Sequence, residues 1–176
     1  MDRNTAVAAH FLREAADLGD AAAQCWLATC YAEGWGVRPD QNEAANLYAM
    51  SARSGYARAQ NNLAVCYADG ANALQRATIS YRVIQPKVYL WMNVGRGRAQ
   101  DRVAAVRWWK HAAASGDATA LTWLGVVHAT GWGNVQLDED AAERYFTGAA
   151  RKGDVDAQAW LSDLRTRRGC ANASTK

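Results

Sequence analysis

The sequence predicts an all-α protein, an α/α solenoid in which about four antiparallel helix pairs stack into a superhelix. The first observation is a repeated pattern: Gly19–Gly34, Gly55–Gly70 and Gly116–Gly131 are copies of one stretch, and a fourth copy begins at Gly153. The second is composition, because half of the 176 residues are apolar and alanine supplies much of that share, which favours closely packed helices over a sheet. The first two copies begin 36 residues apart, and a fixed period of about this length is typical of stacked helix pairs.

The first helix of each unit is expected to begin at an Asp or Asn. The side chain of such a residue accepts hydrogen bonds from the free backbone N–H groups of the first helical turn. These residues are Asn4, Asp40, Asp101 and Asp138. Each helix then carries one apolar stripe in which small and large residues alternate. The stripes are Ala8, Leu12 and Ala15; Ala44, Tyr48 and Ser51; Ala105, Trp109 and Ala112; and Ala142, Phe146 and Ala149. Phe11, Leu47, Trp108 and Tyr145 widen this face, and the small positions let a second helix approach closely.

Glycines separate the two helices of each unit. Gly19, Gly55, Gly116 and Gly153 are expected to end the first helices, because glycine adopts the left-handed conformation at little cost. In the second helix of the second unit, Ala59, Leu63 and Tyr67 form another buried stripe. A loop this short requires the two helices to pack antiparallel.

A surplus of 25 residues interrupts the array between the second and third units, where the period is 61 residues instead of 36. The surplus can be assigned to Ala71–Gly95, which contains both isoleucines of the chain, three basic residues and no acidic residue. One interpretation is a surface loop, with a hairpin formed by Thr78–Ile84 and Lys87–Met92, which are rich in β-formers. The other is a translated intron, which predicts the codons GGT for Gly70 and GTA for Val94.

Few residues of the chain are of types that carry out catalysis or bind metals. No catalytic, cofactor-binding or metal site and no cofactor are expected. His10 and His111 are expected to be solvated, and His128 takes the position of Tyr31 and Tyr67. Cys30 and Cys66 are equivalent positions of neighbouring units, roughly 8–10 Å apart, which is beyond the reach of a disulfide. We therefore expect both to be small buried hydrophobic residues.

Two tryptophans in the linkers are the candidates for partner binding. Trp35 lies in the linker Gly34–Asp40, and Trp132 lies in the linker Gly131–Asp138. An aromatic residue in such a linker either packs against the helix ends or contacts a ligand, and packing is the more common role.

These residues resemble the Sel1-like repeat family, a TPR-like family related to the tetratricopeptide repeats. The shared pattern is Ala-x-Ala-Gln-x-x-Leu-small-x-x-Tyr in the second helix, followed by a Gly-x-Gly linker and an Asp. The resemblance divides the chain into repeat 1 at 4–40, repeat 2 at 40–70, the insertion at 71–95, repeat 3 at 96–137, a partial repeat 4 at 138–168 and a disordered tail at 169–176.

The resemblance implies a non-catalytic scaffold or adaptor that presents a concave face to another protein or peptide, with no small-molecule substrate. One alternative is a secreted, cysteine-rich type of Sel1 protein with β-lactamase-like activity, but this chain lacks the paired cysteines of that branch. Another is weak polyanion binding through the basic insertion and the C-terminal Arg165–Arg168.

Charge and hydropathy give further expectations. The net charge is only +3, which gives no general reason for nucleic-acid or membrane binding. The sequence contains no run of 18 apolar residues, so no membrane-spanning helix is expected. Residues Met1–Val7 lack the layout of a secretory signal. We therefore expect a cytoplasmic protein. Neither end shows an obvious polar capping helix, which indicates a fragment of a longer array or an end covered by a partner.

Overall fold

The computed structural model describes residues 3–68 and 101–173, and every regular element in these ranges is helical. The first two pairs are α1 (Arg3–Asp17) with α2 (Ala21–Glu33) and α3 (Gln41–Arg53) with α4 (Ala57–Tyr67). The next two are α6 (Arg102–Ala114) with α7 (Ala118–Thr130) and α8 (Glu139–Arg151) with α9 (Val155–Ala173). A short 3-10 helix, η3 (Trp132–Asn134), lies in the linker after α7. The all-α prediction is confirmed, and the insertion 71–95 with its hairpin lies outside the described residues.

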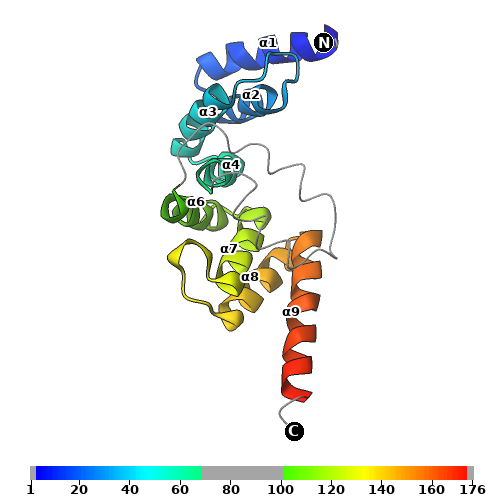
Figure 1. The fold of residues 1–176 in the computed structure, drawn as a ribbon. Coiled ribbons are helices and arrows are strands. Elements are labelled where there is room, and N and C mark those ends of the chain that lie inside the picture. The colour runs from blue at the N-terminus through cyan, green and yellow to red at the C-terminus, as the bar shows by residue number, and fades with distance from the viewer. Residues whose placement is uncertain (1–2, 69–100, 174–176) are drawn as a thin grey trace.

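The helices stack in chain order, each against the one before it, from the N-terminal end at the top of Figure 1 to the C-terminal end at the bottom. The direction of the helices changes along the stack: α1 runs across the view, whereas α9 runs down it (Figure 1). This arrangement is the predicted solenoid of helix pairs.

Aspartates cap the helices, as expected for most first helices. Asp101 and Asp138 accept hydrogen bonds from the backbone N–H groups of Ala104 and Ala141, at 2.9 and 2.8 Å. Asn4 is an exception, because α1 begins at Arg3 and Asn4 is therefore inside the helix. The sequence analysis missed a second set of caps directly after the helix-ending glycines, made by Asp20, Asp117 and Asp154.

The predicted stripes form the core in the last three pairs. Tyr48, Trp109 and Phe146 are among the largest fully buried side chains, and the small residues of the same stripes are buried with them. Cys30 and Cys66 are buried, as expected. The stripe of α1 is more exposed than its equivalents.

The third pair packs on the second as the other neighbouring pairs do. The backbone N–H of Asp101 donates to the carbonyl oxygen of Tyr67 at 2.9 Å, which matches the bonds from Asp40 to Tyr31 and from Asp138 to His128, both at 3.0 Å. The helices α4 and α6 are in direct contact, and the Ser115 hydroxyl near the end of α6 donates to the Gln60 amide oxygen of α4 at 3.2 Å.

The last helix differs from the expectation for the C-terminus. Helix α9 continues to Ala173, so it extends past residue 169, where the disordered tail was predicted to begin. Arg168 of α9 pairs with Glu139, Asp140 and Glu143 of α8 at 2.8–3.1 Å. These ion pairs attach the end of α9 to the start of α8.

Candidate functional site

The linker after α2 folds back on the helix that it leaves. Gly34 has a left-handed conformation and its N–H donates to the Cys30 carbonyl at 2.8 Å, and the Trp35 N–H donates to the same oxygen at 2.9 Å. The linker closes where the N–H of Asp40 donates to the Tyr31 carbonyl. These bonds fix the loop between the end of α2 and the start of α3.

The same linker is pressed against α1. A Cβ atom on Gly36 would lie 2.1 Å from the backbone oxygen of Thr5, so only glycine allows this contact. The equivalent Gly133 lies against α6 in the same way, where its Cβ would be 3.3 Å from the oxygen of Arg102. The first linker is thus held by both helices of its own pair.

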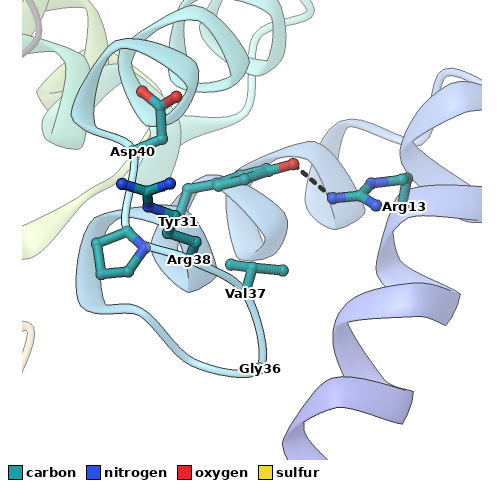
Figure 2. Close-up of a pocket in the computed structure, with 7 residues that line it drawn as sticks. Arg13, Tyr31, Gly36, Val37, Arg38 and Asp40 are labelled. Atoms are coloured by element: carbon teal, nitrogen blue, oxygen red, sulfur yellow. Dashed lines mark hydrogen bonds between the residues drawn. The ribbon is translucent and has the colours of Figure 1, made fainter. Parts of the chain in front are cut away.

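A cavity of about 630 Å³ lies between α1, the end of α2 and this linker (Figure 2). We call it the first-linker pocket. Its lining residues are Arg13, Tyr31, Gly36, Val37, Arg38, Pro39 and Asp40.

The charged groups of the first-linker pocket favour an anionic ligand. The Arg13 guanidinium lies 5.7 Å from the centre of the Tyr31 ring and donates to its hydroxyl, an arrangement visible in Figure 2. Arg38 is an exposed second guanidinium on the pocket wall. The Asp40 carboxylate is engaged as a helix cap, accepting from the N–H groups of Asn42 and Glu43 at 3.0 and 3.1 Å. Arg13 and Arg38 line the pocket at opposite ends of the Tyr31 side chain (Figure 2), and a guanidinium group suits a carboxylate or another planar anion.

Trp35 and Trp132, the two predicted candidates, lie in different environments. Trp132 is only 9% exposed, and its ring centre is 5.7 Å from that of Trp109 and 5.8 Å from the Arg102 guanidinium. Trp35 is 51% exposed and directly precedes Gly36 of the first-linker pocket. Trp132 is therefore part of the core, and partner contact by Trp35 stays a prediction.

The residues under each indole explain the difference. Trp132 rests on α6, which carries Arg102, Val106 and Trp109. The equivalent positions of α1 are Thr5, Ala9 and Leu12, which are smaller. Helix α1 therefore offers less surface to bury an indole. The sequence analysis compared the linkers alone and missed this effect.

The arginines of the first-linker pocket were also missed. The equivalents of Arg13 in later first helices are Ala49, Lys110 and Thr147. Because Lys110 is also a cation, the repeat pattern alone does not single out Arg13, and only its contact with Tyr31 does.

The histidines fit the expected roles. His10 is exposed and lies 3.5 Å from Glu14, and His111 is exposed beside the Trp108 ring. His128 stacks on Tyr145 with ring centres 5.3 Å apart, and burial lowers its pKa, so its ring is neutral near pH 7. In the described part of the chain no three His, Cys, Asp or Glu residues are grouped as a metal site would require.

Comparison with known proteins identifies the family. The sequence model of the Sel1 repeat matches residues 1–20, 21–56, 57–76, 91–117 and 118–154. The chain belongs to the Sel1 repeat family. The match stops at residue 76 and resumes at 91, so the unmatched internal residues 77–90 fall inside the surplus assigned to 71–95.

Two solved structures share the fold. One is c5321, a protective antigen of uropathogenic Escherichia coli described as having an SLR fold, with 25% identity and a TM-score of 0.68 over 95% of this chain. The other is a Sel1 repeat protein from Oxalobacter formigenes, with 26% identity and a TM-score of 0.65 over 90% of this chain. This chain spans 30% and 54% of their lengths. The comparison with curated proteins found no match.

The Sel1 helices carry no membrane-spanning segment within the described ranges, since none of them is both long and apolar enough.

Proposed function

We propose that this Sel1 repeat protein is a non-catalytic scaffold that binds another protein or a peptide on its concave face, with the first-linker pocket as one contact. The observation that carries the proposal is the exposed indole of Trp35 beside a pocket that contains two guanidinium groups. Exposed tryptophan and arginine are the residue types that contribute most to binding at protein interfaces. An acidic side chain or a C-terminal carboxylate of the partner would supply the anion.

The two alternative functions lose support from the packing. Cys25 and Cys30 of α2 are free and buried, so this pair of cysteines in one repeat does not form the paired-cysteine framework of the secreted branch. Arg165, Arg167 and Arg168 all pair with carboxylates of the same chain, namely Glu143, Asp163, Glu139 and Asp140. These paired cations are less available to a polyanion than the sequence indicated.

A comparative pull-down tests the proposal. The tagged wild-type chain and the variants Trp35→Ala, Arg13→Ala and Leu137→Ala are incubated with an extract of the source cells, and the bound proteins are quantified by mass spectrometry. Leu137→Ala is the matched control, because this side chain is also exposed and lies in another linker. We expect one set of proteins to be lost with Trp35→Ala and Arg13→Ala and retained with Leu137→Ala.

Two results would contradict the proposal. Identical sets of bound proteins for all four chains would remove the first-linker pocket as a contact. Hydrolysis of a chromogenic β-lactam by the purified chain above background would overturn the non-catalytic assignment.

A further inference from the structure

The third pair has a counterpart of the corner at which Arg13 lies beside Tyr31. Lys110 of α6 occupies the position of Arg13. His128 of α7 occupies the position of Tyr31. The backbone closes in the same way, because the carbonyl oxygen of His128 accepts from the N–H of Asp138, as that of Tyr31 does in the first linker. A cation and a ring thus occupy the same corner of the first and third pairs.

Helix α8 adds a second cation to this corner. Arg144 directly precedes Tyr145, whose ring stacks on His128 with ring centres 5.3 Å apart. Burial lowers the pKa of His128, Asp138 raises it, and the charges of Lys110 and Arg144 lower it further. Both cations are therefore close enough to His128 to act on its charge. We call Lys110, His128 and Arg144 the third-pair cluster.

The two cations of the third-pair cluster have no carboxylate partner. Lys110 and Arg144 are exposed, and neither forms an ion pair with any residue that the structure describes. The carboxylates nearest to them in sequence are engaged elsewhere. Glu143 pairs with arginines of α9, and Asp138 caps α8. Uncompensated positive charge therefore remains on the surfaces of α6 and α8, which both pack on α7 (Figure 1).

The stacking of helix pairs does not require these charges. In the second pair the equivalent of Lys110 is Ala49, and the equivalent of Arg144 is Asn46. The second pair packs on its neighbours in the same manner without them. The cations of the third-pair cluster are thus available to a ligand.

We propose that the third-pair cluster binds an acidic segment of the partner protein, with carboxylates on Lys110 and Arg144. The proposal rests on the proposed function, because it names the chemistry of the partner for a second contact on the same array. A guanidinium group donates two hydrogen bonds to a planar carboxylate, and an ammonium group binds it as a point charge. Bound carboxylates also favour the protonated form of His128, which then carries a third positive charge.

A nucleic acid suits this surface less well. Proteins that bind duplexes typically neutralise about six to ten phosphates, whereas the third-pair cluster offers two permanent cations. The first turn of α8 also exposes Glu139 and Asp140, which share Arg168 as their partner. A long chain of phosphates would meet these carboxylates, whereas a short acidic segment fits between them and α6.

The test is an NMR titration of the full chain at low ionic strength, which follows the ring signals of its three histidines. The probe is a short peptide of glycine and glutamate with blocked ends, and the control peptide has glutamine in place of each glutamate. His128→Tyr assigns the His128 signal. His10 of α1 reports on the first pair, so binding at the first-linker pocket is distinguished from binding at the third-pair cluster.

We expect the glutamate peptide to shift the His128 signal saturably and to raise the pKa of His128 by about half a unit, the effect of one charge roughly 7 Å away in water. Lys110→Ala and Arg144→Ala should each weaken binding about fivefold. Arg53→Ala is the matched control, because this arginine is also exposed on a first helix, and it should leave the affinity unchanged. The glutamine peptide should give no saturable shift.

An unchanged pKa of His128 at saturating glutamate peptide would overturn the proposal, and so would equal shifts by the two peptides or equal weakening by all three variants. A short DNA duplex that binds more tightly than the glutamate peptide and depends on Lys110 would assign the third-pair cluster to nucleic acid instead. If the titration fails while the pull-down still depends on Trp35, this inference is wrong and the scaffold function stands.

Discussion

The backbone N–H of Asp101 donates to the carbonyl oxygen of Tyr67 at 2.9 Å across 34 positions of sequence. In the uninterrupted linkers the same bond spans nine positions, from Asp40 to Tyr31, or ten, from Asp138 to His128. The carbonyl near the end of one pair thus holds the start of the next in all three cases. The stack of helices is therefore continuous across the interruption.

Packing between α7 and α8 depends on the absence of a side chain at Gly125. A Cβ there would be 2.5 Å from the Phe146 ring, so Gly125→Ala should lower the free energy of unfolding by about 1–3 kcal/mol through overpacking. Urea denaturation measures the change.

Gly148 of α8 is the matched control for Gly125, because it is also a helical glycine but its Cβ would find its nearest neighbour, a Leu121 methyl, at 3.8 Å. Gly148→Ala should raise the free energy of unfolding by about 0.5–1 kcal/mol, since alanine is the better helix former. Equal effects of the two substitutions would show that propensity, rather than contact with Phe146, governs the site.

A buried thiol and a buried phenol make the stability of the fold sensitive to high pH. Burial raises the pKa of the Cys25 thiol from 9.0 to about 12, and burial also raises the pKa of Tyr48. As the pH rises, Cys25 and Tyr48 therefore lose their protons in the unfolded chain before they do so in the folded chain. The contribution of these two groups to the free energy of unfolding is fully present below pH 9 and is lost as the pH rises towards 12. Each group contributes up to about 1.4 kcal/mol per pH unit.

Cys25→Ala isolates the contribution of the thiol. We expect the free energy of unfolding of this variant to fall less steeply between pH 9 and 11 than that of the wild type. Parallel pH profiles for the two proteins would mean that Cys25 titrates alike in the folded and unfolded chains.

The ion pairs of Arg168 attach α9 to α8. Arg168→Ala should lower the thermal midpoint at low ionic strength, because three carboxylates of α8 lose a shared cation. The loss should shrink in about 1 M salt, where charges on the surface are screened. Arg107→Ala, at an exposed position of α6, is the control and should change the midpoint little. An Arg168→Ala effect that high salt leaves unchanged would point to side-chain packing instead.

The origin of residues 71–95 has its own test. Translation of an intron predicts GGT at Gly70 and GTA at Val94 in the gene, and a mature transcript in which Gly70 is followed by Arg96. Sequencing the transcript across codons 70–96 checks this. A transcript that encodes all of these residues leaves the surface-loop interpretation.

The sequence was sufficient for features that depend on spacing. The stripe of Ala44, Tyr48 and Ser51 is buried as predicted, since three positions on one helical face meet the same neighbour in every pair. Cys66 was recognised as a buried hydrophobic residue for the same reason.

Features that depend on a residue in another helix were not predictable from the repeat pattern. Trp35 and Trp132 occupy matching linkers, but Trp132 packs on Trp109 of α6, whereas α1 carries the smaller Leu12 at the position of Trp109. The ion pairs of Arg168 with α8 likewise required the position of α9, so the sequence alone left weak polyanion binding by the basic end of the chain as an alternative. The Arg13–Tyr31 contact joins two helices and has no signature in either one alone.

Deletion of residues 71–95 tests the continuity of the array most directly. It shortens the connection between Tyr67 and Asp101 from 33 intervening residues to eight, which reduces the entropic cost of loop closure by about 1 kcal/mol. Guanidinium unfolding of the deletion variant should show one cooperative transition, with a free energy of unfolding equal to or about 1 kcal/mol above that of the wild type. Two separate transitions, or a clear loss of stability, would contradict a stack that is continuous from α4 to α6.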